Sequence, residues 1–167
     1  MRKLNFFKTL WLVLRHREKI FFDHLTGFFV RSLFYPLIEK EIKRAERYQT
    51  PFSLCFVDID NLKKINDQEG HSQGDKVIKE IARFVEEHCR QSDYLCRYGG
   101  DEFLILLPQT DKTGLENFIK KLERESKKIP YSFSVGGATF QKGKSIEELI
   151  KEADKKMYFS KNSKKNQ

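Results

Sequence analysis

Two β-patterned runs meet in the segment Arg97-Tyr98-Gly99-Gly100-Asp101-Glu102-Phe103-Leu104-Ile105-Leu106-Leu107-Pro108. The two glycines between them predict a hairpin, because glycine accepts the positive φ that tight turns require. Adjacent carboxylates within a strand would point to opposite faces, whereas at a turn Asp101 and Glu102 can reach one site. The pair suits a divalent cation, but a solvated polar turn explains the hairpin equally well.

The bulk composition is that of one globular domain with a short extension. The chain has 167 residues, of which 39% are hydrophobic, and this is enough for a single core. Three cysteines, Cys55, Cys89 and Cys96, form no CxxC pair, which indicates reduced thiols and a cytoplasmic location. No apolar run approaches the length needed to span a bilayer, and the N-terminus lacks the features of a signal peptide.

The net charge of +8 is concentrated at the two ends of the chain. Residues 1–20 have a net charge of +5 and residues 151–167 a net charge of +4. Basic ends can bind nucleic acid or anionic lipid, but solvated charged helices explain them as well. We favour the second interpretation and expect no nucleic-acid partner.

An amphipathic helix is predicted at the N-terminus. Apolar residues recur at three- and four-residue steps between Leu4 and Phe22. We therefore expect residues 1–22 to form a helical extension and residues 23–167 to form the main domain. Such a helix must bury its apolar stripe against its own domain, a second copy or a membrane surface, and we favour a second copy.

In the main domain, predicted strands and helices alternate with hairpins. The predicted strands cover residues 52–57, 94–98, 103–107 and 131–140, and the predicted helices cover residues 30–48, 61–67, 76–90, 113–128 and 145–161. This order predicts an α+β fold in which helices pack on one mainly antiparallel sheet.

A second group of carboxylates, in Asp58-Ile59-Asp60, directly follows the predicted buried strand over residues 52–57. Mg²⁺ typically binds one or two protein carboxylates together with water and substrate phosphates. Two such ions can activate an attacking hydroxyl and neutralise a leaving phosphate. Lys63, Lys161 and Lys165 are candidate phosphate ligands, although most lysines of this kind are simply surface residues.

Two further polar residues, Asn66 and Asp75, flank the turn Gly70-His71-Ser72-Gln73-Gly74. An aspartate can accept two N–H donors at once, which suits the edge of guanine. The alternative for Asp75 is a helix N-cap. His71 is more simply explained as an ordinary turn histidine.

The segment Gly99-Gly100-Asp101-Glu102-Phe103 resembles the signature of the GGDEF family of diguanylate cyclases. Four further blocks resemble the family in the family's order: Asp23-x-Leu25-Thr26-Gly27, Asp58-x-Asp60-x-x-Lys63-x-x-Asn66-Asp67, Gly70-His71-x-x-Gly74-Asp75 and Ala153-Asp154-x-x-Met157-Tyr158. The resemblance covers about residues 23–166. It implies a palm-like fold, ferredoxin-like as in nucleotidyl cyclases, that condenses two GTP into cyclic di-GMP and two pyrophosphates.

The resemblance also implies roles for individual residues. Asp58, the Ile59 carbonyl and Asp101 would bind Mg²⁺, with Glu102 alongside, at two ions per site and with Mn²⁺ as a substitute. Asp101 is the candidate base for the 3′-hydroxyl, beside Glu102. The substrate-binding residues would be Lys63, Asn66, Asp75, Gly99, Gly100, Lys161 and Lys165.

The resemblance further implies a homodimer and feedback by the product. One domain binds one GTP, so two domains must face each other for each 3′-hydroxyl to attack the other nucleotide. Arg90-x-x-Asp93, which ends five residues before the signature, resembles the family's inhibitory site for cyclic di-GMP. The alternative is a surface ion pair of little energetic value.

Some positions depart from the family pattern. These are Phe28, Val30, Leu62 and Lys165, together with a short span from Phe103 to Ser134. None is an implied metal ligand, so we expect an active enzyme. The main alternative is a module that binds GTP or cyclic di-GMP without turnover. A cyclase that also uses ATP and a polymerase palm are more distant alternatives, because Asp75 favours guanine and 167 residues leave no room for fingers or thumb.

Overall fold

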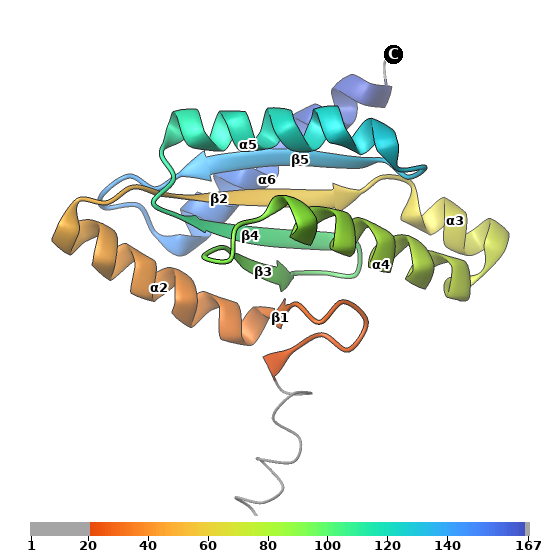
Figure 1. Cartoon of the computed structure of the whole chain (residues 1–167), viewed down its shortest axis with the longest axis horizontal. Coiled ribbons are helices and arrows are strands. Elements are labelled where there is room, and N and C mark those ends of the chain that lie inside the picture. The colour runs from red at the N-terminus through yellow and green to blue at the C-terminus, as the bar shows by residue number, and fades with distance from the viewer. Residues whose placement is uncertain (1–20, 166–167) are drawn as a thin grey trace, which may run out of the picture.

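Five strands form one sheet that is covered by helices on both faces (Figure 1). The computed structural model describes residues 21–165. The strands are β1 (Phe29–Val30), β2 (Phe52–Ile59), β3 (Tyr94–Arg97), β4 (Glu102–Pro108) and β5 (Phe133–Thr139). Their order is β1-β3-β4-β2-β5, and only the β1–β3 pair is parallel. The prediction of an α+β fold with a mainly antiparallel sheet is confirmed.

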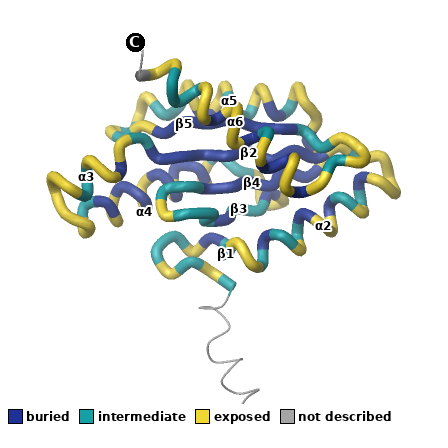
Figure 2. The backbone as a smooth tube through the Cα atoms, turned by 180° about the vertical axis from the view of Figure 1, so that it is seen from behind, coloured by how far each residue is buried: buried dark blue, intermediate teal, exposed yellow. Residues whose placement is uncertain are grey.

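The helices divide the core into two layers. One face of the sheet packs against α2 (Arg31–Tyr48) and α6 (Ile146–Lys165). The other face packs against α3 (Leu62–Glu69), α4 (His71–His88) and α5 (Lys112–Glu125), the last followed by the 3-10 turn Ser126–Lys128. Figure 2 shows the strands as the buried centre of the molecule, between helices whose outer sides are exposed.

The alternation of β2 side chains between the two layers decides where its carboxylate points. Val57 and Ile59 belong to the core with α4 and α5, whereas Leu54 and Phe56 belong to the core with α2 and α6. Because successive side chains of a strand point to opposite faces, Asp58 faces the layer of α2 and α6.

The register with β4 brings a second carboxylate to the same place. Leu104 and Leu106 also belong to the core with α2 and α6, so Glu102 points to that layer. In the antiparallel pairing, Asp58 lies directly opposite Glu102. The hydrophobic pattern of two strands therefore places two acids side by side at one end of the sheet.

Helix α6 can approach the sheet closely because β5 contains a glycine. A Cβ atom on Gly136 would collide with backbone atoms of Met157 in α6. This close contact brings the C-terminal half of α6 to the end of β2. Ser145, the predicted start of the last helix, forms a capping box with Glu148 at the start of α6. The Ser145 hydroxyl accepts from the Glu148 N–H at 3.2 Å, and the Glu148 carboxylate accepts from the Ser145 N–H at 2.8 Å.

Some predicted boundaries were wrong. The helix predicted over residues 76–90 is α4, which begins at His71 and ends at His88, and the strand predicted over residues 131–140 spans only Phe133–Thr139. Asp75 consequently lies inside α4 and makes no cap hydrogen bond. The alternative interpretation of Asp75 as a helix N-cap is therefore wrong.

The predicted N-terminal helix lies almost wholly outside the described residues. At its end, Phe22 forms an isolated antiparallel bridge with Phe29, and their rings stack with centroids 5.1 Å apart. No helix in the described part of the chain is both long and apolar enough to cross a membrane.

Candidate active site

Three carboxylates meet at the end of the two central strands. Asp58 lies opposite Glu102, and one residue further on the Ile59 N–H donates to the Asp101 carbonyl at 2.9 Å. The backbones of Asp101 and Glu102 are thus both fixed to β2. The hairpin prediction placed its two acids beside Asp58 correctly.

The site has an excess of negative charge. Burial raises the pKa of Asp58, and the neighbouring carboxylates of Asp101 and Asp60 raise it further, against the opposing effect of Lys161. Burial, followed by Asp101, Asp58 and Asp154, likewise raises the pKa of Glu102. A bound cation would relieve this repulsion.

Helix α6 supplies lysines to the site. Lys161 donates from Nζ to Asp58 Oδ1. Burial lowers the pKa of Lys161, but this hydrogen bond and the negative charges of Asp58, Asp60 and Asp101 together raise it above its ordinary value. Lys164 donates to the Phe133 carbonyl and lies 3.9 Å from Asp60 Oδ2. Lys164 was not predicted, although its position three residues after Lys161 on one helix was the signal for it. The side chain of Lys165 lies outside the described part of the chain.

The two glycines of the hairpin do not have the role that the sequence suggested. Among the glycines of the described residues, positive φ is found at Gly27, Gly70 and Gly143, but not at Gly99 or Gly100. A Cβ atom on Gly99 would instead collide with the Glu102 carboxylate, whereas Gly100 has open space around its Cα. Gly99 therefore leaves the space in which the Glu102 carboxylate lies, and Gly100 leaves space in front of the turn.

Arg97 holds the tip of the hairpin, a role that sequence reasoning missed. Its Nη2 donates to the Gly100 carbonyl at 2.8 Å, and its Nη1 donates to both carboxylate oxygens of Asp23, at 3.1 and 3.2 Å. Asp23 also accepts from the Thr26 N–H at 3.0 Å and from its hydroxyl at 2.8 Å. The Asp23–Gly27 turn is therefore attached directly to the hairpin.

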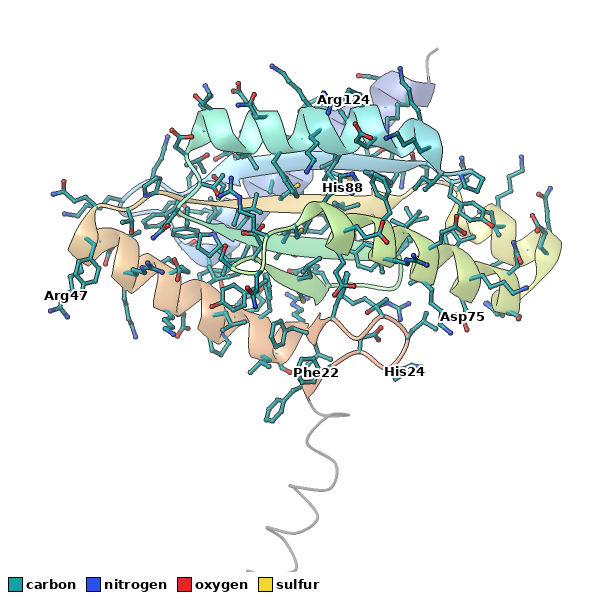
Figure 3. All side chains as sticks on the ribbon, viewed as in Figure 1. Phe22, His24, Arg47, Asp75, His88 and Arg124 are labelled. Carbon is teal, nitrogen blue, oxygen red and sulfur yellow. The ribbon has the colours of Figure 1, made fainter. Side chains whose placement is uncertain are left out.

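A pocket of about 460 Å³ opens beside the hairpin. Its lining includes four of the predicted substrate residues, Lys63, Asn66, Asp75 and Gly100, together with Asp101. Asp75 points outward from the first half of α4, on the side of the molecule that also carries His24 (Figure 3). The pocket thus joins the predicted guanine-binding groups to Asp101, the predicted catalytic carboxylate.

The position of Asn66 in this pocket depends on a glycine. A Cβ atom on Gly74 would collide with the Asn66 side-chain oxygen. The absence of a side chain at residue 74 therefore leaves the space that the Asn66 amide occupies.

The donor set fits a magnesium ion that is shared with a substrate. Among the described residues, no three His, Cys, Asp or Glu side chains already form a metal cage. Mg²⁺ does not require one, because one or two carboxylates with water and phosphates complete its shell. Asp58 and Glu102 on adjacent strands supply the carboxylates, and the ammonium of Lys161 marks where a positive charge is stable.

The predicted inhibitory residues lie at the far end of α4. The Asp93 carboxylate accepts from the Arg90 backbone N–H at 2.7 Å, so the segment forms a tight turn and not the side-chain ion pair considered as an alternative. Arg90 and Asp93 line a pocket of about 290 Å³ together with His88 and Lys121, which sequence reasoning did not select. The guanidinium of Arg90 is left available for a ligand.

The departures from the family pattern fall into two groups. Phe28 is buried in the core, where its ring meets that of Phe103 edge-on with centroids 5.6 Å apart. Val30, on β1, pairs with Arg97 on β3. Leu62 lines the 460 Å³ pocket. Of these three departures, only Leu62 borders the predicted substrate site.

The fold and the site together define a class of protein: a nucleotide-binding palm-like domain with carboxylates for metal-assisted chemistry at one end of its sheet. Residues 20–167 match the family model described as diguanylate cyclase, GGDEF domain. The chain belongs to the GGDEF domain family of diguanylate cyclases.

Individual relatives agree with this assignment. The chain is 32% identical to diguanylate cyclase DosC of Escherichia coli (strain K12) over 160 residues, which cover 90% of this chain and 35% of DosC. It is similar to the structure of diguanylate cyclase SiaD from Pseudomonas aeruginosa in complex with its activator SiaC, with a TM-score of 0.81, 29% identity, and coverage of 93% of this chain and 63% of SiaD. It is equally similar to the GGDEF domain of DgcB from Caulobacter crescentus in complex with c-di-GMP, with a TM-score of 0.81, 26% identity, and coverage of 85% and 88%. The chain thus spans about a third of the length of DosC.

The Asp23–Arg97 contact predicts a pH-dependent stability. Although burial raises the pKa of Asp23, its bonds from Thr26 and the Arg97 charge lower it more, to below the ordinary value of 3.8. Ionised Asp23 therefore stabilises the fold above its unfolded pKa, and this stabilisation is lost as the pH falls through the lower folded pKa. Asp23→Asn should reduce the free energy of unfolding by about 1–2 kcal/mol at neutral pH.

Urea unfolding of both proteins across pH checks this prediction. The difference between them should shrink as the pH falls below the ordinary aspartate pKa of 3.8 and disappear once Asp23 is protonated in the folded protein and resembles asparagine. Glu46→Gln, at an exposed position of α2, is the matched control and should show no comparable loss. A loss that stays constant at all pH values would mean that packing, not the ion pair, is affected.

Proposed function

We propose that this chain is a diguanylate cyclase that condenses two GTP into cyclic di-GMP and two pyrophosphates. The observation that carries the proposal is the register of β2 and β4, which sets Asp58 opposite Glu102 beside the Asp101 turn. Membership of the GGDEF family supports the same activity.

In the proposed site, the pocket beside the hairpin binds one GTP. Asn66 and Asp75 recognise guanine, because Asp75 can accept two N–H groups from the base. Lys63 lies in the same pocket, and Lys161 and Lys165 belong to the helix that borders Asp58. These lysines neutralise the phosphates, while Gly100 leaves room for the nucleotide in front of the hairpin.

The carboxylates hold the cation and accept a proton. Asp58, the Ile59 carbonyl, Asp101 and Glu102 are the proposed ligands of two Mg²⁺ ions, with Mn²⁺ as a substitute. When bound, the metal would supply positive charge for the phosphates and increase the acidity of the 3′-hydroxyl. Asp101, at the tip of the turn, is the group that takes the hydroxyl proton.

The reaction requires two copies that face each other, because each nucleotide supplies both a 3′-hydroxyl and an α-phosphate. Whatever holds the two sites together controls the rate through proximity. We retain residues 1–22 as a separate extension and as the candidate dimerisation element, with a membrane surface as its alternative partner. Substrate GTP and the free cysteines Cys55, Cys89 and Cys96 favour a cytoplasmic location.

The central experiment is incubation of the purified chain with GTP and Mg²⁺, with detection of cyclic di-GMP by mass. Asp101→Ala should reduce the rate by about 10³-fold or more, because it removes both the proposed base and a metal ligand. Glu46→Ala, which removes an exposed acid from α2, is the control and should retain full activity.

Binding of GTP or cyclic di-GMP by the wild-type chain, without any product at high protein concentration, would contradict the cyclase proposal. That result would support the alternative function, a silent binding module.

Product feedback is a separate proposal, based on the pocket that contains Arg90 and Asp93. The Arg90 guanidinium can contact the O6/N7 edge of a guanine in the product in a bidentate manner. Arg90→Ala should weaken inhibition by cyclic di-GMP by about 10-fold or more and leave the initial rate unchanged. Inhibition curves measured with added product test this, with the exposed Arg124→Ala as the control. Unchanged inhibition in Arg90→Ala would refute the site.

A further inference from the structure

Tyr98, the residue before the two glycines, has its ring enclosed by three other side chains. The Phe56 ring meets it edge-on, with centroids 5.4 Å apart and an angle of 71°. The Arg31 guanidinium lies 4.4 Å from the centroid of the Tyr98 ring. The Tyr98 hydroxyl lies 3.3 Å from the Tyr35 hydroxyl, to which Arg31 also donates at 3.1 Å. The proposed chemistry uses none of these contacts.

These contacts join three elements at the base of the hairpin. Phe56 belongs to β2, two residues before Asp58, whereas Arg31 and Tyr35 lie one turn apart on α2. Because the Arg31 guanidinium keeps its charge at any ordinary pH, its attraction to the ring does not depend on titration. Tyr98 is therefore fixed to β2 and to α2 at the same time.

The backbone of Tyr98 is hydrogen-bonded to the residue that carries one of the site carboxylates, Glu102. The Tyr98 N–H donates to the Glu102 carbonyl at 2.8 Å. This hydrogen bond closes the turn formed by Gly99, Gly100 and Asp101. Both Tyr98 and Glu102 line a pocket of about 300 Å³, whose walls also include Arg31, Tyr35 and Phe56. A displacement of the Tyr98 ring would thus move Glu102 relative to Asp58.

We propose that Tyr98 is a positioning residue, its ring held by Arg31 and Phe56, that keeps Glu102 at the correct distance from Asp58 for both to bind one divalent cation. The proposal rests on the proposed function in that Asp58 and Glu102 are taken as metal ligands. Tyr98 itself contacts neither substrate nor metal in this proposal. Its effect comes from the geometry of the hairpin.

The test compares substitutions that remove the ring or the charge with substitutions that keep them. Tyr98→Leu and Arg31→Met should lower kcat for cyclic di-GMP formation by about 10-fold, because even a small misplacement of a metal ligand or reacting group lowers the reaction rate. The KM for GTP should stay within about twofold, since the guanine pocket is not altered. Tyr98→Phe keeps the ring that contacts Phe56 and Arg31, and Arg31→Lys keeps the charge, so both should retain most of the activity.

The second readout is the affinity of the full chain for Mn²⁺, measured by electron paramagnetic resonance. The measurement is made in the presence of 3′-deoxy-GTP, which lacks the reacting hydroxyl and cannot be converted to product. Tyr98→Leu and Arg31→Met should raise the Mn²⁺ dissociation constant by about fivefold or more, whereas Tyr98→Phe should not.

The chain contains a matched control for these substitutions. Arg47 lies 5.2 Å from the ring of Tyr48, an exposed tyrosine at the C-terminal end of α2. Figure 3 shows Arg47 at the opposite end of the molecule from Asp75. Tyr48→Leu and Arg47→Met remove the same kind of contact and should change neither kcat nor Mn²⁺ affinity. If Tyr98→Leu does not fold, as judged by circular dichroism, the exposed position Arg31 still provides the test.

An unchanged Mn²⁺ dissociation constant in Arg31→Met and Tyr98→Leu would overturn the proposal. So would a loss of activity that merely follows the unfolded fraction of each variant. If the wild-type chain makes no cyclic di-GMP, the cyclase proposal fails, but the Mn²⁺ measurement still decides whether Tyr98 positions the carboxylates.

Discussion

The antiparallel register between β2 and β4 is the constraint on which the rest of the site depends. It is fixed by apolar side chains, because a slip by one residue would move every one of them to the other face of the sheet. In this register Asp58 lies opposite Glu102, and the Ile59 N–H donates to the Asp101 carbonyl. The core therefore positions the acids: residues with no chemistry of their own hold three carboxylates together at the end of two strands.

Electrostatic repulsion between these neighbouring acids opposes folding, and the surrounding elements partly offset it. Burial and neighbouring carboxylates raise the pKa values of Asp58 and Glu102. Helix α6 supplies Lys161 as a counter-charge, and it can do so because Gly136 allows the helix to lie close to β5. The site is thus arranged so that a divalent cation, once bound with a nucleotide, would neutralise charge that the protein alone only partly compensates.

The sequence predicted the sheet, the hairpin and the main carboxylates because each has a local signal, such as alternation, a double glycine or a short acidic motif. It failed where a contact joins distant segments. Arg97 and Asp23 are 74 residues apart, and no periodicity indicates that they meet. Gly99 was explained by turn geometry, but its reason is the Glu102 carboxylate packed against it. The start of α4 was missed because one glycine, Gly70 with φ 84°, redirects the chain within a single residue, so that apparent loop residues are already helical.

The most direct test of this account is a crystal structure of the chain with Mn²⁺ and 3′-deoxy-GTP, in which anomalous scattering locates the metal. The account predicts a metal about 2.0–2.5 Å from the Asp58 carboxylate and within reach of the hairpin carboxylates, with guanine next to Asn66 and Asp75. A metal bound only by phosphates, or bound away from the end of β2 and β4, would contradict the claim that the register of these strands builds the site.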